Sequence, residues 1–132
     1  MTDNQRYEHG YEQLIAVSGE SAENLVKAMG DIDSDLTRFL VEFAYGDIYG
    51  RNGIDLKSRQ IGAIGALTAL GTAGPQLKLH VRSALNVGCS QQEIVEVMLQ
   101  TAIFAGFPAA TNGLRLAREV FAENAGDHTD RQ

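Results

Sequence analysis

The expected fold follows from residues 74–93, GPQLKLHVRSALNVGCSQQE, where start and stop signals for helices stand close together. Pro75 suits the first turn of a helix, and Gly88 is a typical left-handed stop. Ser90 and Glu93 have the spacing of a capping box, which opens a further helix. Between proline and glycine, apolar positions recur at the three- and four-residue spacing of one helix face: Leu77, His80, Val81, Ala84 and Leu85. The stretch therefore predicts two successive helices.

The same spacing extends in both directions, and no segment alternates as a strand does. Helices are expected over 5–17 and 21–29, and a third is expected to begin at a cap formed by Asp33 or Ser34. Further helices are expected over 55–70, 75–87 and 90–105, and from Pro108 to about Asn124. The third helix carries an apolar stripe that is expected to face the core: Leu36, Phe39, Leu40 and Phe43. It is expected to end in a glycine-rich loop over 45–53. The helix over 55–70 is apolar all round and expected to be central. Phe104 and Phe107 are expected in the core.

These helices predict an all-α, single-domain bundle of six to seven helices over residues 1–132, with a core at 5–124 and a flexible tail at 126–132. The chain has 132 residues, 44% of them hydrophobic and 21% charged, which is ordinary for one globular domain. No apolar leader opens the sequence, and the weakly polar run 61–70 is too short to span a membrane. A cytoplasmic protein is the expectation.

The charge distribution favours a small anionic ligand over nucleic acid. The formal net charge is −6, whereas nucleic-acid phosphates require a basic surface. The segment 51–88 is nevertheless basic, with five cationic residues against Asp55. A basic middle within an acidic chain suits a small anion. The alternative is that the charges of solvated helix faces fall this way by chance.

The cysteine and histidine content excludes several kinds of site. Cys89 is the one cysteine, so an internal disulfide and a Cys-x-x-Cys redox pair are ruled out. The three scattered histidines, His9, His80 and His128, do not complete a zinc ligand set. We expect no metal and no cofactor.

Residues 76–86, QLKLHVRSALN, resemble the signature region of 4-carboxymuconolactone decarboxylases. Similar positions follow at helical spacing over 93–110, and 5–10 and 46–48 also look like that family. The resemblance covers residues 5–122. It implies the helical fold of the alkylhydroperoxidase-like superfamily, assembled as trimers or hexamers with sites near subunit contacts.

The resemblance also has departures. Alkylhydroperoxidase-like members work through two cysteines, which would stand near Ala73 and Gln76 in this chain. Members close to the aromatic-degradation enzymes carry a histidine where Phe43 stands. Many superfamily members carry a glutamate where Gln60 stands. A related lactone or another carboxylated ring is therefore also a candidate substrate.

The resemblance implies a reaction that removes CO2 from a carboxylated unsaturated lactone in the degradation of aromatic compounds. The electrons flow to the lactone carbonyl, so no cofactor is required. His80 is the expected proton donor or oxyanion partner, and the alternative is a core histidine bonded to a backbone carbonyl. The remaining candidates are Arg59 and Gln60 as catalytic residues, with Arg82, Lys78, Asp47, Tyr45 and Gln100 binding the substrate.

Each of these candidates has a structural alternative. Arg82 and Lys78 lie on a different face from His80 and are otherwise solvated charges; Arg59 can form a simple ion pair. Gln60 and Gln100 can satisfy a buried helix end, and Asp47 can orient His80 or Arg59 or only cap its loop. A non-catalytic helical scaffold and a redox protein using Cys89 are the competing functions.

Overall fold

The computed structural model describes the backbone of residues 1–130 and the side chains of residues 1–123. These residues form helices joined by short turns, with no strand in the described part, so the all-α prediction is confirmed. They separate into two compact units, one over 1–56 and one from Lys57 onward. The single-domain expectation stays a prediction. No helix in the described part has the length and apolar content that crossing a membrane would take.

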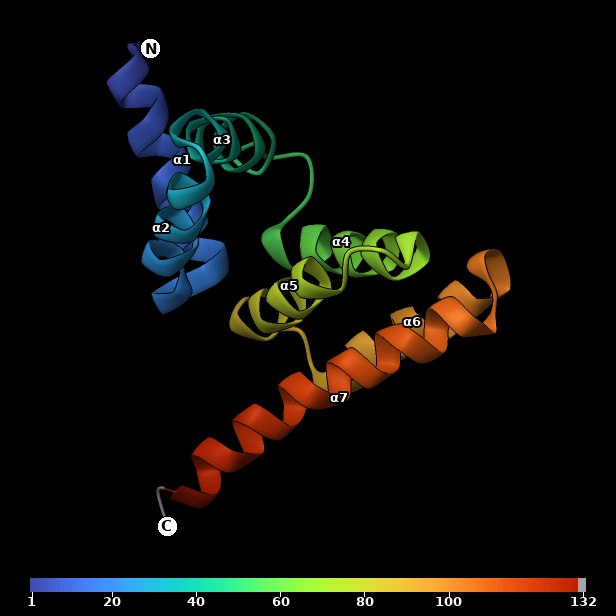
Figure 1. The fold of residues 1–132 in the computed structure, drawn as a ribbon. Helices are drawn as coiled ribbons and strands as arrows, with labels where there is room; N and C mark the ends of the chain where they lie inside the picture. Colours follow the sequence, from blue (N-terminus) through green and yellow to red (C-terminus); the bar gives the residue numbers. More distant parts are fainter. Residues whose placement is uncertain (131–132) are drawn as a thin grey trace. The chain divides into compact units, whose positions relative to one another are not determined.

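The first unit contains α1 (Asp3–Ser18), a 3-10 turn (Gly19–Ser21), α2 (Ala22–Ile32) and α3 (Ser34–Phe39). Figure 1 draws this unit in blue and teal. Asp33 begins α3, because its Oδ1 accepts hydrogen bonds from the backbone of Asp35 and Leu36 at 2.8 and 3.1 Å. The predicted cap is therefore confirmed.

Helix α3 passes directly into a π-helix over Leu40–Ile48, which packs against α1. The contact is so close that a Cβ atom on Gly10 would lie 2.0 Å from the carbonyl oxygen of Val41. A Cβ on Gly46 would lie 3.3 Å from the Cα of Gly10. Two glycines therefore let the backbones meet, and the core beside them is formed by Leu14, Val17, Ala22, Val41 and Tyr45.

Two predictions for this unit are wrong. The apolar stripe of the third helix does not face the core: Phe39 is 56% and Phe43 is 57% exposed. The opposite face, with Val41, Tyr45 and Gly46, is buried because it is the one that fits against Gly10. The predicted loop over 45–53 is also helical as far as Ile48, so its first residues have a fixed helical position.

The second unit contains α4 (Leu56–Leu70), α5 (Gly74–Asn86), α6 (Gln91–Ala105) and α7 (Phe107–Asp130). The predicted boundaries are confirmed by their local geometry. Ser90 and Glu93 form both hydrogen bonds of the capping box. Gly88 has φ +101°, a conformation that favours glycine, and it follows the end of α5.

The core of this unit lies between the four helices, and α7 runs alongside α6 (Figure 1). Its fully or almost fully buried members are Ile64, Leu77, Val81, Ala84, Cys89, Ile94, Met98, Ala117 and Val120. Helix α4 is not buried all round, because Gly62, Ala66 and Ala69 are exposed.

Two further predictions for this unit are wrong. Phe104 is 87% and Phe107 is 78% exposed, since both lie at the turn between α6 and α7 rather than along the packed faces. Helix α7 continues to Asp130 instead of ending near Asn124. Of the predicted flexible tail, residues 131–132 and the side chains of 126–130 lie outside the described part.

Candidate functional site

The second unit brings His80 and Gln60 together. His80 lies on α5 and Gln60 on α4, and His80 Nδ1 donates a hydrogen bond of 2.8 Å to Gln60 Oε1. An amide oxygen can only accept, so the proton of the neutral ring is on Nδ1 and Nε2 keeps its lone pair. Gln60 is completely buried, whereas His80 is partly exposed. The imidazole therefore keeps some exposed surface, whereas the amide has none.

The surroundings keep this histidine uncharged near neutral pH. Burial lowers the pKa of His80 from its ordinary 6.5, and no charged neighbour contributes to the change. The Nε2 atom of Gln60 is buried and has no hydrogen-bond partner in the described part of the chain. Leaving a buried donor without a protein partner costs about 1–3 kcal/mol.

The predicted cationic residues of this unit differ in their surroundings. Lys78 Nζ lies 3.1 Å from Glu119, and Arg82 forms two hydrogen bonds of 3.0 and 2.9 Å with the carboxylate of Glu123. Both pairs connect α5 to α7. A substrate carboxylate would have to compete with these glutamates. Arg59 precedes Gln60 on α4 and is partly buried, with its Nε atom enclosed.

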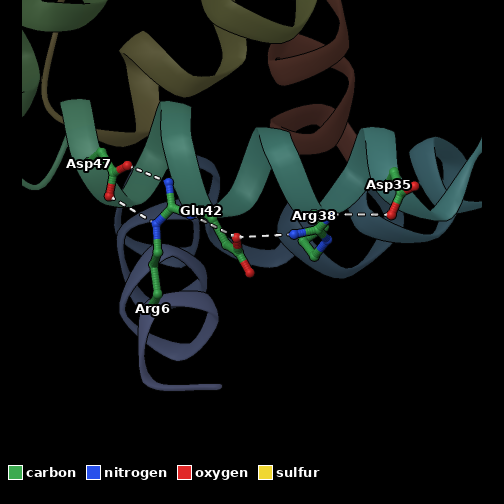
Figure 2. Close-up of polar contacts among 5 residues, drawn as sticks. All are labelled: Arg6, Asp35, Arg38, Glu42 and Asp47. Atoms are coloured by element: carbon green, nitrogen blue, oxygen red, sulfur yellow. Dashed lines mark hydrogen bonds and ion pairs between the residues drawn. The ribbon is translucent and has the colours of Figure 1, made fainter. Parts of the chain in front are cut away.

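In the first unit, Asp47 is held by Arg6. Two hydrogen bonds, of 3.3 and 2.5 Å, join the Arg6 guanidinium to the Asp47 carboxylate, as Figure 2 shows. The Arg6 hydrogen bond lowers the pKa of Asp47, which therefore stays ionised. Its carboxylate is engaged by Arg6, which was not among the predicted site residues.

The same arginine also contacts Glu42, a buried carboxylate that was not among the predicted site residues. Arg6 Nη1 lies 3.2 Å and Arg38 Nη1 lies 3.8 Å from Glu42, whose side chain is only 5% exposed (Figure 2). Arg38 continues the network to Asp35 at 3.3 Å. One signal was available: a carboxylate within an otherwise apolar helical run requires a partner if it is buried.

The other predicted site residues lie in different surroundings. Tyr45 is 3% exposed in the core of the first unit, where burial raises the pKa of its hydroxyl to about 12. Its ring meets Tyr49 edge-on, with centroids 5.0 Å apart. Gln100 lies on the exposed face of α6. Cys89 is 5% exposed and packs in the core of the second unit. Tyr45 and Cys89 thus offer little surface to a ligand.

The described part of the chain contains no cluster of three or more metal-binding side chains. What it offers chemically is a partly exposed imidazole whose Nδ1 is held by Gln60. Such a group can accept a proton, or deliver one once the ring is charged.

A model of the carboxymuconolactone decarboxylase family matches residues 34–119. The chain is 33% identical over 124 residues to 4-carboxymuconolactone decarboxylase of Acinetobacter baylyi, which covers 93% of this chain and 92% of that protein. It is 36% identical over 99 residues to an uncharacterized 15.0 kDa protein from the nqo9-nqo10 intergenic region of Paracoccus denitrificans, covering 74% of each chain. It is 28% identical over 104 residues to nitrosuccinic acid decarboxylase of Metarhizium robertsii, covering 79% of this chain and 72% of that protein. These matches extend over the helices that carry His80 and Gln60, and the chain belongs to the carboxymuconolactone decarboxylase family.

Proposed function

We propose that this protein is a cofactor-independent decarboxylase of 4-carboxymuconolactone or a related small carboxylated lactone. Family membership and two relatives named as decarboxylases support decarboxylation. The observation that carries the proposal is the partly exposed His80, held at Nδ1 by a buried amide. We place the protein in the cytoplasm, in the degradation of aromatic compounds.

In the proposed reaction the bond between the carboxylate and the lactone ring breaks and CO2 leaves. The electron pair moves through the ring double bond to the lactone carbonyl, which becomes the oxyanion of a dienolate. A proton from Nε2 of the charged His80 ring then adds to a carbon of the lactone, which gives the enol-lactone, and the neutral imidazole takes up a proton from solvent before the next turnover. The substrate is its own electron acceptor, so this scheme needs no cofactor.

The same scheme defines a wider class of substrates. Nitrosuccinic acid, in the name of the Metarhizium robertsii relative, has a nitro group that can accept the electron pair as a carbonyl does. We therefore propose acids in which the carbanion left by CO2 is stabilised by an acceptor group of the substrate itself. Arg59 is a proposed carboxylate-binding residue, because a guanidinium binds a carboxylate through two hydrogen bonds. Arg82, Lys78 and Gln100 remain proposed substrate-binding residues, to be tested by substitution.

We further propose a homotrimer or homohexamer. Large apolar side chains stand exposed at the turn between α6 and α7, where Ile103 is 77% and Phe104 is 87% exposed. Contact with another copy would remove them from water. Sedimentation velocity at micromolar concentration tests this proposal, and a monomer alone would contradict it.

The decarboxylase proposal is tested by incubating the purified protein with synthetic 4-carboxymuconolactone and following CO2 release. Release is expected, and His80→Ala is expected to lower kcat at least about a hundredfold, the usual contribution of a proton-transfer residue. Nitrosuccinic acid forms a second arm of the assay. An absence of release from both acids, or full activity in His80→Ala, would refute the proposal.

A further inference from the structure

The hydrogen bond between His80 and Gln60 determines which ring nitrogen can exchange a proton. His80 Nδ1 lies 2.8 Å from Gln60 Oε1, and an oxygen acceptor there requires a proton on Nδ1. This requirement is met by the neutral ring protonated at Nδ1 and equally by the charged ring. Gln60 can therefore keep the same hydrogen bond while the ring gains or loses a proton at Nε2.

The reverse orientation of the amide does not allow this. If Gln60 Nε2 donated to the ring, Nδ1 would have to be an acceptor and could carry no proton. The charged ring has protons on both nitrogens, so it would lose its anchor each time it formed. Because Gln60 is completely buried, its amide could not turn toward water to compensate. The orientation with Oε1 facing the ring is the one compatible with both charge states.

We propose that Gln60 is a positioning residue that anchors Nδ1 of His80 in both charge states, so that the ring exchanges its proton only at Nε2. Its importance for catalysis depends on the decarboxylase function proposed above. Because the anchor is an uncharged amide, it does not favour the charged ring as a carboxylate would. The ring is thus left to be charged when an anionic substrate binds.

No other charged group in the described part of the chain favours the charged form of the His80 ring in the free protein. The elements packed around α5 carry charged side chains of both signs: Lys57 and Arg59 on α4, Glu93 and Glu96 on α6, and Arg115, Arg118, Glu119 and Glu123 on α7. Glu93 is paired with Lys57 at 3.0 Å, while Glu119 and Glu123 hold Lys78 and Arg82. Burial is the cause of the lowered pKa of His80, with no contribution from these charges.

The test is nitrogen NMR of the full chain with isotope-labelled histidine, which reports the protonation of each ring nitrogen. The His80 signals are identified by their loss in His80→Gln. In the wild-type protein above the pKa of His80, the proton is expected on Nδ1. In Gln60→Glu, which has nearly the same shape, the pKa of His80 is expected to rise by about one pH unit or more, a tenfold change in the ratio of charged to neutral ring.

Gln91→Glu is the matched control, since it adds the same charge at an exposed position at the start of α6. It is expected to leave the tautomer and the pKa of His80 nearly unchanged. A wild-type neutral ring protonated at Nε2 would overturn the proposal, as would equal pKa changes in the two variants. If Gln60→Glu does not fold, the wild-type tautomer alone decides.

The readout needs no substrate, so it is separate from the test of the decarboxylase. If CO2 release is also observed, its decrease at high pH is expected to move to higher pH in Gln60→Glu, because the proton donor stays charged longer. A protein with the predicted tautomer but no decarboxylase activity would keep the anchor and refute only the function.

Discussion

Replacing Gly10 by alanine is predicted to destabilise the first unit, although alanine is the better helix former. A Cβ at this position would lie 2.0 Å from the carbonyl oxygen and 2.7 Å from the carbonyl carbon of Val41. Ordinary contacts of a Cβ begin at 3.4 Å, so the backbones would have to separate by roughly 1 Å or more. Both atoms belong to helical backbone and cannot rotate aside.

The change in the free energy of unfolding caused by Gly10→Ala follows from two opposing effects. Overpacking of a tight contact costs about 1–3 kcal/mol, occasionally more, while alanine gains about 1 kcal/mol over glycine within a helix. Because the displaced backbone also supports the core formed by Leu14, Val17 and Tyr45, we expect the upper part of that range. The free energy of unfolding should therefore fall by about 2 kcal/mol.

Gly62→Ala provides the matched control within α4. A Cβ at Gly62 would have no atom within 4 Å, so only the helix propensity changes. That variant should gain about 0.5–1 kcal/mol. Urea unfolding followed by far-ultraviolet circular dichroism measures both variants. A Gly10→Ala protein as stable as the wild type would refute the inference that backbone contact holds α1 and the π-helix together.

Three further predictions concern charge and association. Burial lowers the pKa of His80 below 6.5, so the unfolded chain binds this proton more readily than the folded chain. The free energy of unfolding should therefore fall as the pH decreases from about 7.5 through 6.5 toward the pKa of the folded state. In urea unfolding, His80→Gln should lack this part of the pH dependence, and a pH profile unchanged from the wild type would contradict the prediction. Glu42→Gln leaves Arg6 and Arg38 without their buried carboxylate and should lower the free energy of unfolding by about 1–2 kcal/mol. Asp35→Asn, at the exposed end of the network, should change it by no more than about 0.5 kcal/mol. Equal effects of the two substitutions in urea unfolding would argue against a role for burial. Phe104→Glu should reduce the proposed oligomer in sedimentation velocity, and an unaltered distribution would show that this turn lies outside the contact.

The helix boundaries set by capping residues and glycines could be predicted from the sequence because their causes are local. The capping box joins Ser90 to Glu93 across three residues, and Gly88 and Gly106 adopt positive φ angles at the ends of helices. Asp33 likewise binds backbone groups two and three residues away. Such interactions depend little on the rest of the chain, so propensity and spacing are sufficient.

The buried face of the third helix could not be predicted in this way. Its apolar stripe is the more hydrophobic face, but the close approach of Gly10 to Val41 favours the opposite one. That approach joins residues of two helices, and it occurs where the chain forms a π-helix. A hydrophobic pattern describes one helix at a time, so it does not contain the shape of the partner.

The candidate site shows the same difference between what local sequence predicts and what tertiary contacts decide. The sequence by itself determined the all-helical class, the family, and the two candidates that meet, His80 and Gln60. Only the tertiary structure decided that Asp47 binds Arg6 and that Arg82 binds Glu123, since each pair is separated by 41 residues. The physical reason is that the strength of an ion pair depends on the distance between the charges in space and not on their separation along the chain. Local sequence reveals which groups are charged, but only folding selects the carboxylate that each arginine holds.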